Sequence, residues 1–235
     1  MRPTATQKQL GQLFYNEPMI VTIDGPAGAG KSTVARQLAE RLGFRLLDTG
    51  AMYRAVTLAA LEAQIDLADA GAMAALAKQI SIAFECQHVL LNGEDVSEAI
   101  RTPEVSRNIY RAADNPEVRA HLVSLQRQIA EDTDIVCEGR DQGTVAFPNA
   151  DCKIFLVASS AERARRRRDE LAGRGIEMPL QQVLAEQDQR DQRDASRPVG
   201  ALRKADDAHE VCTDGLTLEE VVAQLEAIVR AVQHG

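Results

Sequence analysis

The sequence predicts an α/β fold in which helices flank a parallel sheet of five strands. Short apolar, β-branched runs alternate with stretches of helical periodicity, and this alternation is typical of parallel sheets covered on both faces. The first run ends in a glycine-rich segment that leads directly into a helix, as in phosphate-binding loops. The five apolar runs are Met19–Ile23, Leu46–Leu47, Ile135–Cys137, Ile154–Val157 and Val211–Cys212.

Signals for helix starts support the helices between these runs. The first helix follows the glycine-rich segment, because Val34, Leu38 and Leu42 repeat at steps of four. Later helices are marked by a polar cap residue that precedes a proline or is followed three positions on by a glutamate. These signals are Thr102-Pro103, Asn115-Pro116 and Thr217 with Glu220.

Two stretches depart from this alternation. In residues 80–99 the pattern predicts short strands that lead into Asn92-Gly93, a strong signal for a β-hairpin. A hairpin that interrupts the α/β alternation indicates an inserted lobe. Residues 162–197 are polar and rich in Arg and Asp, with Gly173 and Gly175 in the middle. We expect this second stretch to form two exposed helical arms joined by a flexible tip.

Composition and charge exclude several classes of protein. The 235 residues are 45% hydrophobic and 26% charged, which excludes a disordered chain, collagen and a small disulfide scaffold. The net charge of -8 opposes binding to nucleic acid or to an anionic membrane. Any polyanionic ligand must therefore be held by cations that cluster locally.

The sequence predicts a cytoplasmic protein with one main domain. Its apolar stretches fall far short of the ~18 residues that a membrane-spanning helix needs, and the first residues lack the apolar core of a secretory signal. We expect residues 1–17 to form a flexible tail and residues 18–235 to form a single domain.

The glycine-rich segment carries the strongest functional signal. It matches G-x-x-x-x-G-K-[ST], whose backbone N–H groups and helix N-terminus hold phosphate oxygens, while the dinucleotide motif G-x-G-x-x-G is absent. Lys31 is expected to bridge the outer phosphates of a bound nucleotide, and Ser32 to ligate Mg²⁺. The predicted ATP-binding residues are Gly25, Pro26, Ala27, Gly28, Ala29, Gly30, Lys31, Ser32 and Thr33.

This loop alone does not separate a GTPase switch, an ATP-driven motor and a small-molecule kinase. No N-K-x-D motif is present to recognise guanine, but arginine is concentrated in residues 163–174 and 190–197. One interpretation of the first cluster is a solvated helix face that pairs with Asp169 and Glu170. For Arg166 and Arg167 a second hypothesis competes, in which a mobile arm closes over the reacting phosphates, supplies positive charge and excludes water.

Several longer segments carry a family resemblance. The P-loop together with these segments resembles bacterial cytidylate kinases, within the superfamily of P-loop nucleoside monophosphate kinases, from residue 19 to 230. The segments are Leu46–Arg54, Asn92–Val96, Ile100–Thr102, Glu138–Val145, and Arg190–Asp194 followed by Arg197.

The resemblance implies transfer of the γ-phosphoryl group of ATP to CMP, and also to dCMP, with Mg²⁺, in pyrimidine metabolism. The expected partners are these small-molecule substrates, with no nucleic acid and no membrane, and the expected state is a monomer. The inserted lobe, at about 72–110, would bind the acceptor nucleotide, and an arginine-rich lid would span about 163–195.

The resemblance also implies roles for individual residues. Arg54, Arg140 and Arg197 would hold the acceptor phosphate, while Asp141 and Arg119 would face cytosine. Arg190 and Asp194 would bind the ribose, and Glu138 would act on Mg²⁺ through water. The implied CMP-binding residues are Thr49, Arg54, Tyr110, Arg119, Arg140, Asp141, Arg190, Asp194 and Arg197, and the implied catalytic residues are Lys31, Arg140, Arg166, Arg167 and Arg197.

Structural alternatives compete with these roles. Arg197 would otherwise form a surface pair, Arg54 would pack against a helix, and Asp141 would cap the turn after Glu138. Arg190 and Asp194 would otherwise form a simple surface pair.

The chain also departs from the family at one position. Tyr110 stands where the family has a small hydroxyl residue against cytosine, so the base contacts there are open.

Two other functions also stay open. One is a kinase for another acceptor, such as UMP or shikimate, and the other is a non-catalytic module that senses nucleotides.

Overall fold

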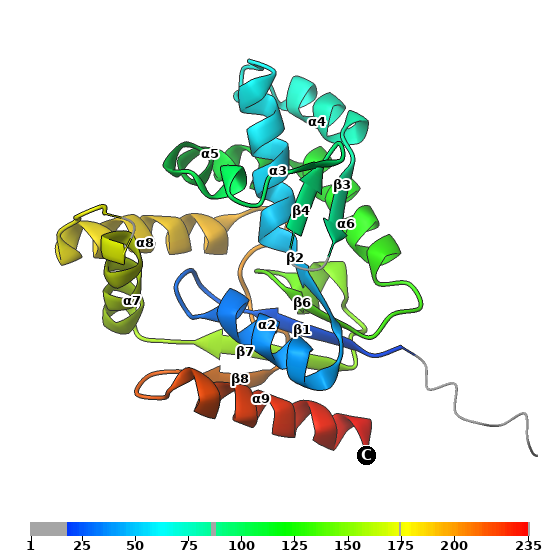
Figure 1. The fold of residues 1–235 in the computed structure, drawn as a ribbon, viewed down its shortest axis with the longest axis vertical. Coiled ribbons are helices and arrows are strands. Elements are labelled where there is room, and N and C mark those ends of the chain that lie inside the picture. The colour runs from blue at the N-terminus through cyan, green and yellow to red at the C-terminus, as the bar shows by residue number, and fades with distance from the viewer. Residues whose placement is uncertain (1–17, 86–87, 174, 235) are drawn as a thin grey trace, which may run out of the picture.

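The central layer of the protein is a sheet of five parallel strands, which confirms the predicted fold. A computed structural model describes residues 18–85, 88–173 and 175–234 (Figure 1). The strand order is β2-β6-β1-β7-β8, and every neighbouring pair runs parallel. The strands are β1 Ile20–Asp24, β2 Arg45–Asp48, β6 Ile135–Glu138, β7 Cys152–Val157 and β8 His209–Cys212. The predicted tail, residues 1–17, lies outside the described residues.

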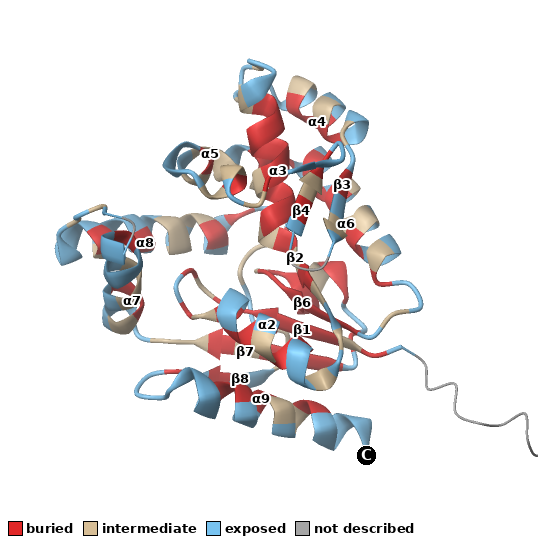
Figure 2. Ribbon diagram, viewed as in Figure 1, coloured by how far each residue is buried: buried red, intermediate tan, exposed pale blue. Residues whose placement is uncertain are grey.

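Helices cover both faces of this sheet because side chains along each strand alternate between them. In β6, Ile135 and Cys137 face the core beneath α3 and α6, whereas Val136 faces the core beneath α2 and α9. Figure 2 shows these buried residues concentrated on the strands and on α3. A fully buried aliphatic side chain contributes about 1.5–3 kcal/mol, so both faces stabilise the sheet. The flanking helices are α2 Lys31–Leu42, α3 Thr49–Glu62, α6 Pro116–Ile129 and α9 Leu218–Gln233.

A lobe built on α3 and α6 stands above one end of the sheet (Figure 1). It contains a small antiparallel sheet of order β3-β4-β5. Asn92 and Gly93 both adopt left-handed backbone, with φ of 52° and 87°, as a two-residue hairpin turn requires. The predicted hairpin is thus confirmed, and its acceptor-binding role stays a prediction. The remaining elements of the lobe are α4 Ala70–Gln79, β3 Ile82–Glu85, β4 His88–Leu91, β5 Glu94–Asp95, the short helix η2 Ala99–Arg101, and α5 Pro103–Ala113.

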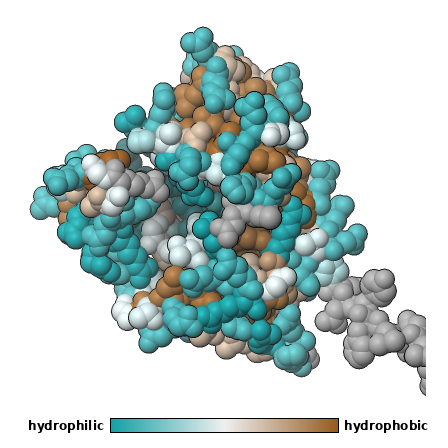
Figure 3. Space-filling model, viewed as in Figure 1, coloured by the Kyte–Doolittle hydropathy of each residue, from teal (hydrophilic) through white to brown (hydrophobic). Residues whose placement is uncertain are grey.

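Two helices, α7 Ser160–Gly173 and α8 Leu180–Ser196, form an arm at the side of the molecule. Figure 3 shows hydrophilic side chains over most of this arm. A small apolar cluster of Ala164, Leu171 and Val183 joins the two helices. The predicted helical pair is therefore present, and it has little apolar core of its own.

The predicted helix starts are also confirmed. Thr102 accepts a hydrogen bond from the N–H of Val105, and Thr217 with Glu220 forms a complete capping box. Asn115 accepts from two N–H groups at the start of α6. In the described part of the chain, no helix combines the length and the apolar character needed to cross a membrane.

Candidate active site

The phosphate-binding loop joins β1 to α2 at the carboxyl edge of the sheet, where parallel sheets bind their ligands. Gly25 has a φ of 147°, and a Cβ there would overlap the carbonyl oxygen of Leu156, so only glycine fits. Gly30 precedes α2 without a side-chain cap, which leaves the first N–H groups of the helix available to an anion. The buried Lys31 folds back, and its Nζ donates to the carbonyl oxygen of Pro26 at 2.8 Å.

A hydroxyl and two carboxyl groups lie beside this loop. Ser32 Oγ donates to Glu138 Oε1 at 2.7 Å. Burial, and then the neighbouring Asp48, raise the pKa of Glu138 to about 7. This set of oxygen donors suits a hard cation such as Mg²⁺. Within the described ranges no group of three or more acidic, His or Cys side chains could hold a metal alone, so phosphate and water oxygens would have to complete its coordination. The sequence analysis did not assign Asp48.

Asp24, at the end of β1, positions the turn that follows β6. Its two carboxylate oxygens accept from the N–H groups of Gln142 and Gly143 at 2.9 and 2.8 Å. Burial raises the pKa of Asp24 to about 6. These two bonds hold the short π-helical turn η3, Gln142–Ala146, next to the phosphate-binding loop, and with it Arg140 and Asp141.

Buried and half-buried cations lie together at this edge of the sheet. Burial, and then the charge of Arg140, lower the pKa of Lys31 to about 7, and the same two causes lower the pKa of Arg190 to about 10. Burial also lowers the pKa of Arg54, with Arg101 and Arg167 adding to the effect. Cations that disfavour one another's charge in this way are stabilised by an anionic ligand between them. The site is therefore electrostatically suited to phosphate groups, although the chain as a whole is acidic.

Asp194 brings two of the predicted acceptor-binding arginines together. It accepts from Arg140 Nε at 3.0 Å and from Arg197 Nη2 at 2.6 Å, and Arg197 Nε donates to Asp114 at 2.6 Å. The side chain of Arg197 is only 5% exposed, so the alternative of a surface pair is wrong for Arg197 and for the buried Asp194. Sequence analysis missed Asp114, because no local pattern links it to a partner so distant in the chain.

Arg119 and Asp141 form a buried ion pair on the lobe side of the site. The side chain of Asp141 does not cap the turn that follows it, so that alternative is wrong. Arg119 Nη1 donates to the carbonyl oxygen of Ala113 at 3.1 Å, and its guanidinium lies 5.6 Å from the centre of the Tyr53 ring. Among the described residues, the buried Nε of Arg119 has no hydrogen-bond partner. The pair thus offers a buried donor and a carboxylate to a planar ligand.

Three other predicted CMP-binding residues contact protein groups. Thr49 Oγ1 donates to the carbonyl oxygen of Glu138 at 2.8 Å. Arg54 Nη1 donates to Ser106 Oγ at 2.8 Å and to the carbonyl oxygen of Ile100 at 3.1 Å, as expected for packing against α5 and η2.

The third is Tyr110, whose ring centre lies 4.9 Å from the Arg111 guanidinium and 4.5 Å from that of Arg193. The nucleotide contacts of all three residues stay predictions.

The arginines of α7 divide into two groups. Arg165 and Arg168 are exposed and pair with Asp169, as predicted for a solvated helix face. That prediction is wrong for Arg163, which is buried and donates to the carbonyl oxygen of Ala27 at 2.9 Å. The same side chain pairs with Asp191 of α8 at 2.6 Å, so it joins both arm helices to the phosphate-binding loop.

Arg166 and Arg167 lie on the side of the arm that faces the core. Arg166 Nη1 donates to Thr213 Oγ1 at 2.9 Å and lies near Gly30, since a Cβ on that glycine would be 3.7 Å away. Arg167 pairs with Glu170 at 2.7 Å, and its charge helps to lower the pKa values of both Arg54 and Arg190. Their catalytic role stays a prediction.

Replacing Glu138 with glutamine should change how stability depends on pH. The pKa of Glu138 is about 7 in the folded chain against 4.5 when unperturbed, so between these values the folded state binds more protons and wild-type stability falls as pH rises. Glutamine cannot ionise. The ligand-free variant should therefore melt above wild type at about pH 8, and the gap should close at about pH 4. Thermal melts across this range measure the effect.

The matched control for this experiment is Glu131→Gln, because Glu131 is exposed. This variant should follow the wild-type melting curve. Equal melting temperatures for wild type and Glu138→Gln at every pH would contradict the raised pKa of the buried Glu138 carboxyl group.

The fold and the phosphate-binding loop define a P-loop protein whose buried and half-buried cations suit phosphate groups. A sequence model of the family described as Cytidylate kinase matches residues 21–231. The "Cytidylate kinase" of Rhodopirellula baltica is 50% identical over 212 residues, which are 90% of this chain and 93% of that one. The chain belongs to the cytidylate kinase family.

Further similar proteins cover most of the chain. The "Cytidylate kinase" of Carboxydothermus hydrogenoformans is 50% identical over 215 residues, 90% of this chain and 97% of that one. Among solved structures, a gluconokinase from Sinorhizobium meliloti 1021 matches with a TM-score of 0.47 and 18% identity, over 93% of this chain and 95% of that chain.

Proposed function

We propose that the chain transfers the γ-phosphoryl group of ATP to CMP, giving CDP and ADP, with dCMP as a second acceptor. One observation carries the proposal beyond family membership. The hydrogen bond of 2.7 Å between Ser32 Oγ and Glu138 Oε1 brings the end of β6, and with it Arg140, against the phosphate-binding loop. Burial, and then the charge of Arg140, lower the pKa of Lys31 in that loop to about 7. This arrangement supports action of the two cations on adjacent phosphates, as transfer between two nucleotides requires.

In this reaction an oxygen of the CMP phosphate attacks the γ-phosphorus of ATP. A new P–O bond forms as the bond to the β–γ bridging oxygen breaks, and ADP leaves with that electron pair. The attacking oxygen is already anionic, so no general base is required. Lys31 and Arg140 would offset the charge of the phosphates. Because both cations are already in place before the reaction, they would stabilise the transition state without having to reorient. Arg166 and Arg167 would add charge from the arm, which also shields the phosphates from water.

Ser32 would hold Mg²⁺ by its hydroxyl, and Glu138 would contact the ion through water. When bound, the ion offsets the charge of the outer phosphates of ATP. The hydrogen bond between these two side chains, 2.7 Å long, already holds the hydroxyl and the carboxyl side by side.

The Arg119 and Asp141 pair supports cytosine as the base. Asp141 would accept from the exocyclic amine of cytosine, and Arg119 would donate to a ring acceptor. Uracil presents a carbonyl oxygen where cytosine presents the amine, so two acceptors would meet without a proton between them. Such an arrangement costs about 1–3 kcal/mol, which predicts poor use of UMP.

The proposal is tested by measuring ADP release with Mg-ATP and each of CMP, dCMP, UMP, AMP, GMP and shikimate, beside a control without acceptor. Turnover confined mainly to CMP and dCMP is the expected result. Turnover led by UMP or shikimate would keep a kinase but overturn its acceptor. Tight ATP binding without turnover of any acceptor would favour a nucleotide-sensing module instead.

Gly200 should be required for use of CMP. It has a φ of 71°, and a Cβ there would overlap the guanidinium of Arg119 and the carboxylate of Asp141. Gly200→Ala should therefore lower kcat/KM for CMP by about 10-fold or more, because the added Cβ would displace the two side chains proposed to face the base, and a displacement of about 1 Å can cost about 10²-fold. Steady-state kinetics with CMP measure this change.

Gly215→Ala is a matched control, since Gly215 has a similar φ of 73° and open space around it. Both variants carry the same backbone strain, but only one disturbs the ion pair. Equal kinetics for the two variants would show that the contact at Gly200 is irrelevant to the acceptor.

A further inference from the structure

Two side-chain pairs join the lobe to the arm at the C-terminal ends of α5 and α8. The ring of Tyr110 lies 4.5 Å from the guanidinium of Arg193, and Asp114 accepts from Arg197 Nε at 2.6 Å. The two partners in each helix are four residues apart, so each helix presents both of its partners on one face. Figure 1 shows α5 above α8, with the core of the protein to one side.

The Asp114 contact fixes a side chain that the proposed reaction uses. Arg197 donates Nε to Asp114 and Nη2 to Asp194, each at 2.6 Å. Two carboxylates on different edges of one guanidinium determine both its position and the direction of its plane. Nη1 of Arg197 donates to the carbonyl oxygen of Gly200 at 3.4 Å, a longer hydrogen bond than the other two. This nitrogen is therefore the part of the guanidinium most available to a phosphate.

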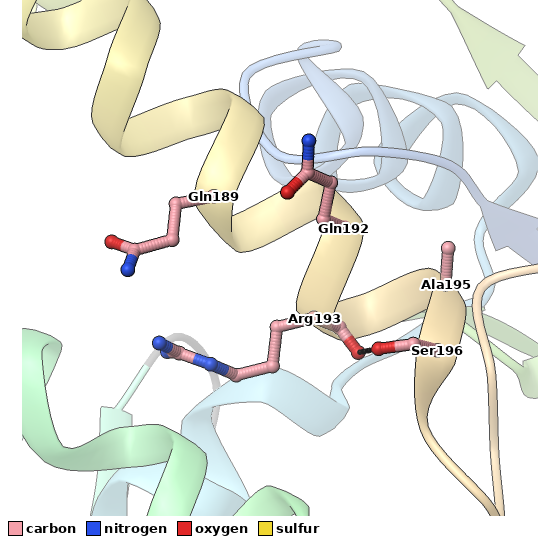
Figure 4. A pocket seen from close by; sticks show the side chains of 5 residues that line it. All are labelled: Gln189, Gln192, Arg193, Ala195 and Ser196. Carbon is pink, nitrogen blue, oxygen red and sulfur yellow. Dashed lines mark hydrogen bonds between the residues drawn. The ribbon is translucent and has the colours of Figure 1, made fainter.

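The Tyr110 contact acts on the helix as a whole. Arg193 immediately precedes Asp194 in α8, and its side chain extends away from the helix and lines a pocket beside it (Figure 4). Asp194 instead points inward and is buried. A cation held over an aromatic ring is attracted by the negative face of the ring. Holding Arg193 over Tyr110 therefore helps to fix the end of α8 from which Asp194 accepts hydrogen bonds from Arg140 and Arg197.

We propose that Asp114 and Tyr110 are positioning residues for the acceptor phosphate, and that they act through Arg197 and Arg193. Neither residue needs to touch the phosphate, because each holds an arginine of the arm in the place where the lobe requires it. The proposal rests on the proposed function, since it assumes that Arg197 binds the acceptor. Losing either contact should weaken acceptor binding and leave ATP binding, which depends on the loop at Lys31, nearly unchanged.

The test compares the KM for CMP with the KM for ATP in variants of both pairs. Asp114→Asn keeps the shape of the side chain and removes its charge, and it should raise the KM for CMP about 10-fold, because a charge-assisted hydrogen bond is lost. The KM for ATP should stay within about 2-fold. Asp169→Asn is the matched control, since Asp169 is an exposed aspartate of the arm that also pairs with arginines. It should behave as wild type.

A double-mutant cycle tests the second pair. Tyr110→Ala and Arg193→Ala should each raise the KM for CMP, and the double variant should be no worse than the more affected single variant, because both remove one contact. Tyr110→Phe, which keeps the ring, should restore most of the loss seen with alanine. If phenylalanine were as damaging as alanine, the hydroxyl and not the ring would matter, and the proposed role of Tyr110 would be wrong.

The outcomes separate this inference from the proposed function. If wild type phosphorylates CMP but Asp114→Asn changes neither KM, or changes both equally, the inference fails and the function stands. If wild type uses a different acceptor, the proposed function fails, and the same variants are then measured with that acceptor. If wild type phosphorylates no acceptor, both fail. Melting temperatures of all variants identify any general loss of folding.

Discussion

Replacing Lys31 with methionine should lower kcat by about 10²- to 10³-fold, the effect of removing one fixed donor from a transition state. Lys31 is buried beside the phosphate-binding loop, and its Nζ donates to the carbonyl oxygen of Pro26. Methionine fills a similar volume but offers no charge to the phosphates of ATP. Rates of ADP release at saturating ATP and CMP measure the loss.

Unfolding should not account for this loss. Burial and Arg140 lower the pKa of Lys31 from 10.5 to about 7, so the folded chain binds its proton less well than the unfolded chain does. Between these values the unfolded state holds more protons, and a charged Lys31 therefore costs stability in the absence of ligand. The methionine variant should melt no lower than wild type.

Lys78→Met is the control for Lys31→Met, because Lys78 is an exposed lysine that pairs with Glu117 on the lobe. It should turn over at the wild-type rate. Wild-type turnover by Lys31→Met would refute the assignment of the phosphate-binding loop.

Replacing Asp141 with asparagine should shift the preference from CMP toward UMP. An asparagine amide can donate to the carbonyl oxygen of uracil, whereas the carboxylate can only accept. We expect kcat/KM for CMP to fall about 10- to 100-fold, with a much smaller change for UMP. The ratio of the two values is the quantity to measure.

The ratio also separates recognition from stability. Asp141 is buried against Arg119, and breaking a buried ion pair by neutralising one partner commonly costs about 3–5 kcal/mol. A less stable enzyme would lose activity toward both acceptors equally, so their ratio would not move. An unchanged ratio of CMP to UMP would therefore remove Asp141 from base recognition.

The parts of the fold that local chemistry determines could be predicted from the sequence. The turn at Asn92-Gly93 needs two left-handed residues, and Thr217 with Glu220 satisfies the first N–H groups of α9 without help from elsewhere. The phosphate-binding loop is likewise a continuous segment whose glycines carry the signal. In each case the residues that interact are close together in the chain.

Features that depend on packing between distant segments could not be predicted in this way. Arg163 belongs to a run of arginines that looks uniform in sequence, and only its contact with Ala27 and Asp191 makes it a buried link. Asp114 and Arg197 are 83 residues apart, with no periodicity to connect them. Gly200 looks like an ordinary loop glycine in the sequence. Only the close approach of Arg119 and Asp141 shows that a side chain would not fit there.

The small apolar cluster between α7 and α8 also bears on the motion of the arm. Ala164, Leu171 and Val183 form a far smaller cluster than the cores on either side of the central sheet, so the packing of these two helices against each other supplies a small part of the total folding free energy. Segments of this kind open locally many times before the whole chain unfolds. The two helices can thus loosen repeatedly while the sheet that holds the phosphate-binding loop stays intact.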